Sequence, residues 1–147
     1  MNNLYLSIFR QLLNYHDFIE YYEYLDKDFL KNEYPEYYKI YKAIGALIKE
    51  EKEYSVDDLE VAFYGLYPST KPEMVQPLLE SIKAKSLLDA TTIRDFLQKI
   101  KKASLAQQLA EIYIKISSEP DKVEYETERV RLQGLLDRLL ANAGSLD

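Results

Sequence analysis

The sequence has no cysteine and no tryptophan, and only 4 glycines and 1 histidine among its 147 residues. A chain without cysteine forms no disulfide framework and no zinc site built on thiolates. Few glycines leave few positions for tight turns, which favours helices over hairpins of strands. The sequence also lacks the run of roughly 18 apolar residues that a membrane helix needs and the basic-then-apolar start of a signal peptide. We therefore expect a cytoplasmic protein, bacterial or made in a phage-infected bacterium, with no membrane contact.

Catalytic motifs are missing as well. The sequence contains no phosphate-binding loop, no dinucleotide-binding glycine pattern and no serine elbow. Its glycines are scattered, and Gly45 and Gly134 fall inside expected helices, where a glycine indicates close helix packing or a local weakness. We therefore expect no enzymatic activity within this chain, no cofactor and no metal.

The residues that are abundant describe a folded, acidic domain. Apolar residues make up 47% of the chain, which is enough for a hydrophobic core and excludes disorder for the chain as a whole. The length suits one domain of ordinary size. The net charge of −6 argues against a dedicated nucleic-acid surface, because phosphate neutralisation needs an excess of lysine and arginine. A protein partner is the better expectation.

Apolar residues recur at helical spacing along almost the whole chain, and no alternating pattern of useful length predicts a strand. Start signals for helices occur at Asp17, Ser55, Thr70, Asp89 and Asp121. The stretch 26–34 is expected to be a loop, and Pro35 suits the first turn of the next helix. The expected helices span residues 3–15, 17–24, 35–51, 55–68, 70–88, 89–117 and 122–141, before a short tail at 142–147.

This pattern predicts an all-α fold in two parts. Residues 1–88 are expected to form a compact helical bundle, and residues 89–147 a long antiparallel helical hairpin. The helix over 89–117 is longer than the ~10–14 residues of a typical globular helix. A hairpin of that length shares only part of its surface with the bundle, so a second copy of the chain is the simplest partner for the remainder.

Two small groups of titratable residues are candidates for a catalytic site. His16 has no second histidine or cysteine at metal-ligand spacing, and a residue at a helix junction is the stronger interpretation. Asp57, Asp58 and Glu60 lie in the first turn of an expected helix, where acids serve as caps. A small acid–base enzyme using His16 or the pair Asp57 and Asp58 is therefore the weakest of the hypotheses.

The aromatic and basic groups also have two interpretations each. Stacking of nucleic-acid bases on the tyrosines requires a basic groove, but residues 17–36 carry seven acidic side chains against two lysines, so packing is favoured. The basic group of Arg94, Lys99, Lys101 and Lys102 is expected to be a solvated helix face, and any DNA contact weak or indirect. The tyrosines concerned are Tyr21, Tyr22, Tyr24, Tyr34, Tyr37, Tyr38 and Tyr41.

The apolar stripe on the two long helices is the main functional signal. Its residues span more than one face of each helix, so part of the stripe is expected to form an oligomer or partner interface rather than the inside of the hairpin. The candidate interface residues are Leu105, Leu109, Ile112, Ile116, Leu132, Leu135, Leu136 and Leu139.

The order of these elements resembles the N-terminal domain of DnaB-type replicative DNA helicases, especially the phage versions. The resemblance covers nearly the whole chain and is one of pattern and element order. Its segments are 7–9 (Ser-Ile-Phe) with leucines at 12 and 13, 27–30 (Lys-Asp-Phe-Leu), 37–41 (Tyr-Tyr-Lys-Ile-Tyr), 54–59 (Tyr-Ser-Val-Asp-Asp-Leu) and the hairpin over 90–141.

The resemblance implies a collar domain that hydrolyses nothing itself. Such domains pair through the helical hairpin, three pairs form the collar of a six-subunit ring, and the collar docks primase and, in some systems, a helicase loader. The ATP-dependent motor of such a helicase would lie beyond this sequence. The alternative is a free-standing small helical adaptor that binds another protein.

Overall fold

The computed structural model describes residues 2–141, so the expected tail at 142–147 lies outside the described residues. Within residues 2–141 the chain forms eight α-helices and one 3-10 helix, and no β-strand beyond an isolated bridge between Asn14 and Glu53. The predicted all-α class is confirmed. Among the described residues, no helix combines the length and the apolar character needed to cross a membrane.

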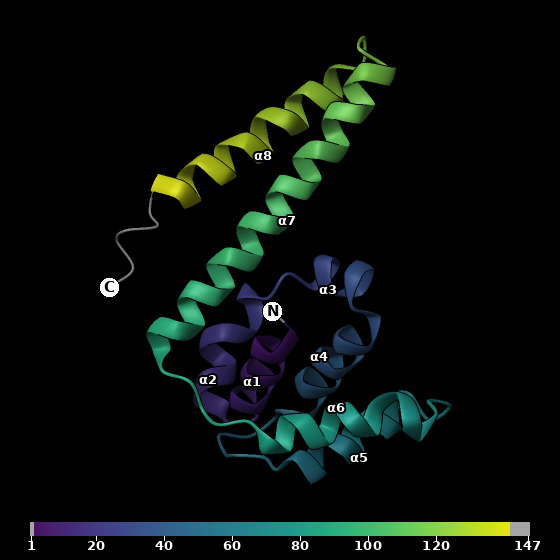
Figure 1. The fold of residues 1–147 in the computed structure, drawn as a ribbon, viewed down its shortest axis with the longest axis vertical. Helices are drawn as coiled ribbons and strands as arrows, with labels where there is room; N and C mark the ends of the chain where they lie inside the picture. The colour runs from purple at the N-terminus through teal and green to yellow at the C-terminus, as the bar shows by residue number, and fades with distance from the viewer. Residues whose placement is uncertain (1, 142–147) are drawn as a thin grey trace. The chain divides into compact units, whose positions relative to one another are not determined.

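The chain divides into two compact units, Met1–Ile93 and Arg94–Asp147. The domain boundary that the sequence predicts, after Leu88, stays a prediction. The first unit holds the shorter helices, and the second holds most of α7 and all of α8 (Figure 1). The elements are α1 (Asn2–Leu12), α2 (Tyr15–Tyr21), η1 (Tyr22–Tyr24), α3 (Lys27–Glu33), α4 (Pro35–Leu47), α5 (Val56–Leu66), α6 (Pro72–Ala84), α7 (Ala90–Ser118) and α8 (Val123–Ala141).

Helix α1 is the core element of the first unit. It packs against α2, α4 and α6, and its side chains at five consecutive positions, 5–9, are all buried. Tyr5, Ile8, Phe9 and Leu12 form one apolar stripe at helical spacing, Leu6 lies beside it, and the buried polar side chains of Ser7 and Gln11 lie on the other side of the helix. Helices α3 and α5 pack against α4, and α5 also contacts α6.

One buried polar side chain in α1 holds the segment that follows α6. The Gln11 Nε2 donates to the Leu88 carbonyl oxygen at 3.0 Å, and the Leu88 N–H donates to Gln11 Oε1 at 2.8 Å. An amide side chain can pair with both groups of one peptide position, which satisfies backbone atoms that have no helix or sheet partner. Gln11 therefore joins two segments 77 positions apart in the sequence.

Several predicted helix starts are confirmed. The Ser55 Oγ accepts from the Asp58 N–H at 3.1 Å, and Asp58 Oδ2 accepts from the Ser55 N–H at 3.0 Å, which is the predicted capping box of α5. Asp89 caps α7 by accepting from the Thr92 N–H at 2.8 Å. Pro35 is in the first turn of α4.

Three local predictions were wrong. The expected loop at 26–34 contains α3, because the Asp26 carboxylate accepts from the Phe29 N–H at 2.9 Å and caps a helix there. Asn14 rather than Asp17 caps α2, which begins earlier than predicted. Thr70 makes no cap, since Lys71 is the N-cap residue of α6 and Pro72 follows it.

The second unit is built on α7 and α8. The chain turns between the two helices at Pro120, where the Lys122 N–H donates to the Glu119 carbonyl at 3.2 Å, and α8 runs back along α7 (Figure 1). Leucine and isoleucine side chains of both helices join in one cluster, described below. Because each helix buries one stripe against the other, the pair has a small hydrophobic core of its own.

Candidate protein-interaction surface

The interior of the α7–α8 pair contains half of the predicted interface residues. Leu105, Leu109 and Ile112 on α7 and Leu132 on α8 are buried and form one cluster. Leu132 is only 2% exposed. These four side chains hold the two helices together, so in a single chain they are core residues.

The other predicted interface residues lie at the edge of this cluster. Ile116 on α7 and Leu135, Leu136 and Leu139 on α8 are partly buried and pack against the four buried residues. Their remaining surface is apolar and faces outward from the cluster. The interface role of all eight residues stays a prediction, and these four are the ones with surface left for a partner.

Further apolar side chains of α7 and α8 are exposed and were not among the predicted interface residues. Val123, close to the turn, is 74% exposed and Ile114 is 67% exposed. The spacing of apolar residues could indicate that the stripe exceeds one face, but it could not assign these members to the outside. The exposed members are Tyr113, Ile114, Val123, Val130 and Leu140.

Ion pairs mark the part of α8 that faces water. Arg129 binds Glu126 and Arg131 binds Glu128, each three residues apart on the exposed surface. The bond from Arg129 lowers the pKa of Glu126, and the bond from Arg131 lowers the pKa of Glu128. Such exposed pairs contribute little stability because water and salt screen them, but they indicate a solvated strip beside the apolar one.

The tyrosines of the first unit are mostly packing residues. The rings of Tyr22 and Tyr41 stack 4.3 Å apart at 5°, and each hydroxyl donates to the other residue's carbonyl oxygen at 3.4 Å. Tyr5 and Tyr37 lie edge to face at 5.9 Å beside Tyr34. The favoured packing interpretation is confirmed at the buried Tyr21, Tyr37 and Tyr41, whereas Tyr24 is 65% exposed.

Burial of these rings changes their titration. Desolvation is the largest cause in each case and raises the pKa of Tyr5, Tyr22, Tyr37 and Tyr41, because burial penalises the tyrosinate form. For Tyr41 the neighbouring Tyr22 raises the pKa further. Because desolvation is the largest cause of all four shifts, the shifts are consequences of packing.

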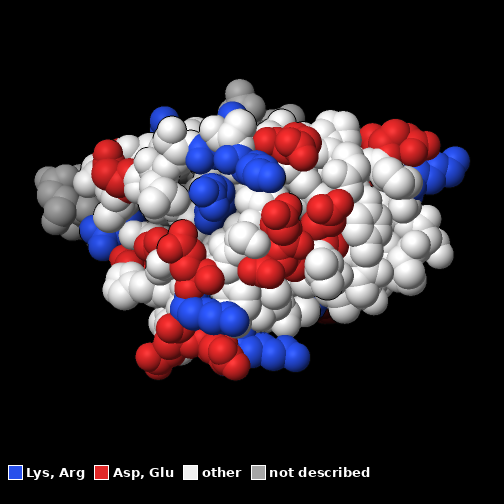
Figure 2. Space-filling model, turned by 90° about the horizontal axis from the view of Figure 1, so that it is seen from below, with Lys and Arg blue, Asp and Glu red and all other residues white. Residues whose placement is uncertain are grey.

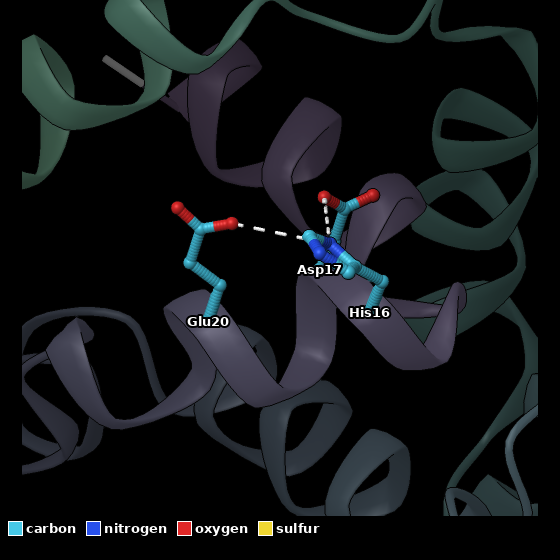
Figure 3. Close-up of side chains that lie close together, drawn as sticks. All are labelled: His16, Asp17 and Glu20. Atoms are coloured by element: carbon cyan, nitrogen blue, oxygen red, sulfur yellow. Dashed lines mark ion pairs between the residues drawn. The ribbon is translucent and has the colours of Figure 1, made fainter.

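His16, Asp17 and Glu20 form a small cluster at the start of α2 (Figure 3). The His16 Nδ1 lies 3.9 Å from Asp17 Oδ1 and 3.9 Å from Glu20 Oε2, and the three ligand atoms lie within 4.8 Å of one another. Desolvation raises the pKa of Asp17, with His16 opposing the shift and Glu20 adding to it. The His16 side chain is 83% exposed, so the cluster is a solvated ion-pair group at a helix junction.

The other charged candidates also lie on solvated helix surfaces. Asp57 and Asp58 are exposed in the first turn of α5, and Glu60 accepts from the Gln76 amide at 2.5 Å. Lys99 and Lys101 are exposed on α7, and Lys102 is half-buried. Figure 2 shows acidic side chains interspersed with basic ones on the face that it draws, rather than an unbroken basic surface.

A groove in the first unit was missed by the sequence reasoning. It encloses about 470 Å³ between α4 and the segment that joins α5 to α6. Leu66 and Met74, both about half-exposed, line it together with Tyr67 and with Lys39 and Lys71. No motif marks this place in the sequence, because the lining comes from three separate elements and only the fold brings them together.

Comparison of the chain with protein-family models, with curated proteins and with solved structures found no match.

Proposed function

We propose that this chain is the N-terminal collar domain of a DnaB-type replicative DNA helicase, in which a helical bundle is followed by an antiparallel hairpin. In this proposal the hairpin joins subunits into dimers and, within the whole helicase, into a ring of six. The domain docks a primase or a helicase loader and has no catalytic activity of its own. The element order and the segments at 7–9, 27–30, 37–41 and 54–59 support the proposal through their resemblance to that family.

The observation that carries the proposal is the apolar surface left over on α7 and α8. Their shared cluster buries Leu105, Leu109, Ile112 and Leu132, but five more apolar side chains that pack against it are only partly buried. Five further large apolar side chains of these helices are exposed. Apolar side chains concentrated on one helix pair favour a protein interface, and an equivalent surface on a second copy complements it in a two-fold dimer.

Sedimentation velocity and native mass spectrometry over a range of concentrations test the proposal. We expect a dimer, or a concentration-dependent larger species, with helical circular dichroism unchanged across the range. A strict monomer at the highest concentration would sink the self-association proposal.

Single substitutions separate the interface from the core. Leu136→Asp, at a partly buried position, is expected to shift the equilibrium towards monomer while keeping most of the helix content. Leu109→Asp buries a charge inside the pair and is expected to lower helix content and stability instead. Val61→Asp on α5, 75% exposed in the other unit, is the matched control and should leave the mass distribution unchanged.

A free-standing adaptor is the alternative. It is favoured by two exposed apolar side chains of the first unit, Leu66 at the end of α5 and Met74 at the start of α6. An adaptor of this kind is expected to remain monomeric alone and to form a one-to-one complex with its partner. The sedimentation experiment therefore distinguishes it from the collar domain.

A further inference from the structure

The groove between α4 and the α5–α6 connection has an apolar floor. Leu66 ends α5 and Met74 lies in the first turns of α6, and both are about half-exposed although they are large apolar side chains. Tyr67 lies between them in the sequence and also lines the groove. At about 470 Å³ the hollow has the size of sites that hold a few side chains.

The groove walls are fixed by local bonds. The Tyr67 N–H donates to the Phe63 carbonyl oxygen at 2.8 Å, and the two rings pack with centroids 5.3 Å apart. The Thr70 N–H donates to the Tyr67 carbonyl oxygen at 3.2 Å. Pro68 and Pro72 restrict the backbone on both sides of this turn. A ligand would therefore meet a preformed surface rather than have to order a loop.

The net charge of the groove lining is positive, whereas the net charge of the chain is negative. Lys39 Nζ lies 3.6 Å from Glu36 Oε1 and 5.6 Å from the centre of the Tyr67 ring, so Glu36 neutralises much of its charge. Lys71 has no ion pair within the part of the chain that the structure describes and is exposed. The lining thus carries a net charge of +1 on a chain whose net charge is −6.

We propose that this groove is a docking site for an extended segment of another protein in which a large apolar residue is followed by an acidic one. The apolar side chain lies on Leu66, Met74 and the Tyr67 ring. The acidic side chain lies beside Lys71, whose ammonium is the cation that nothing in the described chain neutralises. The site lies wholly within the first unit and does not depend on self-association through α7 and α8.

A pair of short peptides tests the groove. The probes are the blocked hexapeptide acetyl-Gly-Ser-Met-Asp-Ser-Gly-amide and its uncharged twin with Asn in place of Asp, each titrated into the full chain and followed by amide NMR. We expect the Asp peptide to shift the amides of residues 66–74 with a Kd of about 1 mM, and the Asn peptide to bind more weakly. Because the chain is acidic overall, preference for the Asp peptide would require a locally basic site.

Two variants and two matched controls locate the site. Lys71→Glu is expected to weaken binding of the Asp peptide by about three- to tenfold and to leave binding of the Asn peptide unchanged. Met74→Gln is expected to weaken binding of both peptides. Lys83→Glu, at the other end of α6, and Val61→Gln, exposed on α5, should leave both affinities within about twofold. Circular dichroism checks that each variant is folded.

Three results would overturn the proposal. The first is no shift of residues 66–74 at 10-fold above the expected Kd, or about 10 mM peptide. The second is equal affinity for the Asp and Asn peptides. The third is an equal loss of affinity for the Asp peptide in Lys71→Glu and Lys83→Glu. None of these results alters the sedimentation experiment, so failure here and failure of the collar proposal are separate outcomes.

Discussion

Gly45 and Gly65 both lie in helices of the first unit, but their surroundings differ. A Cβ built on Gly45 would meet the Tyr22 hydroxyl and lie 2.9 Å from Cζ of the same ring. That ring is held by its stack on Tyr41 and by the bond from its own hydroxyl to the Tyr41 carbonyl oxygen, so it has little freedom to move. A Cβ on Gly65 meets nothing within 4 Å.

We therefore predict opposite effects of the same substitution. Gly45→Ala is expected to lower the free energy of unfolding by about 1–3 kcal/mol, because overpacking displaces the Tyr22 ring. Gly65→Ala is expected to raise it by up to about 1 kcal/mol, because alanine costs less backbone entropy than glycine in a helix. Urea unfolding of the two variants beside the parent chain measures both, and equal effects would contradict the packing at Gly45.

At the scale of single elements, the capping box of α5 gives a prediction with a pH dependence. Ser55→Ala removes the side-chain cap and is expected to lower the free energy of unfolding by about 1 kcal/mol at neutral pH. Ser55→Asp, which keeps an acceptor at the N-cap, should restore most of the loss. Chemical unfolding at pH 7 provides the measurement.

The carboxyl group of Asp58 makes the stability of this capping box depend on pH in the acid range. The bonds from Ser55 lower the pKa of the Asp58 carboxyl below its ordinary value of 3.8. A depressed folded-state pKa gives stability that is present above the unfolded pKa and is lost as the pH falls through the folded one. Asp58→Ala removes the carboxylate that accepts from the Ser55 N–H, so the difference in stability between the parent and Asp58→Ala should shrink below about pH 4, and a constant difference down to pH 2 would contradict this linkage.

The bond pair between Gln11 and Leu88 gives a second prediction at this scale. Gln11→Leu removes the buried side chain that pairs with the N–H and the carbonyl oxygen of Leu88. Each backbone group left unsatisfied costs about 1–3 kcal/mol. We expect a loss of at least about 2 kcal/mol in the free energy of unfolding. Gln133→Leu, which removes one exposed bond to Asp137, is the control and should change stability by less than about 0.5 kcal/mol.

The helices themselves could be predicted where the sequence carries local signals. The start of α5 at Ser55 and of α7 at Asp89 followed from capping chemistry, which acts within four residues. Helix α3 was missed because its seven residues carry too little periodicity to distinguish a short helix from a loop. The Gln11 bond and the groove could not be predicted, because each depends on segments that only tertiary packing brings together.

At the scale of the whole molecule, the tyrosines predict an alkaline transition. Burial raises the pKa of Tyr5, Tyr22, Tyr37, Tyr41 and Tyr67 above the ordinary value of 10.0. A raised folded-state pKa of an acid gives stability that is complete below the unfolded pKa and is lost as the pH rises through the folded values. The fold should therefore weaken above about pH 10.

Tyrosinate absorbance measured together with circular dichroism checks this transition. We expect the exposed tyrosines to ionise first, with helix content intact, and the buried ones to ionise only as the helices unfold. Ionisation of all 14 tyrosines in one step before any loss of helix would show that the rings are accessible. Tyr41→Phe, which removes one buried hydroxyl, should reduce the late phase.

The sequence also predicted that the apolar stripe of the long helices is more than one helix pair requires, and residues such as Ile114 and Val123 are exposed. It could not sort the members, because spacing along one helix does not say which side faces the neighbouring helix. Leu109 and Leu136 illustrate the limit, since both fit the same stripe but only Leu109 is fully buried. The fold shows which residues of the stripe are buried, and the mass in solution tests whether the exposed ones mediate self-association.

The contact of α1 with α6 and the bond from Gln11 to Leu88 bear on how the chain emerges from the ribosome. Helix α1 is made before α6, and Gln11 is made 77 residues before its partner Leu88. At a synthesis rate of ~5–20 residues per second, the Gln11 side chain waits roughly 4–15 s for that partner. During translation, therefore, the side of α1 that α6 and Leu88 cover in the folded unit stays open for some seconds, and nascent-chain chaperones can bind it there.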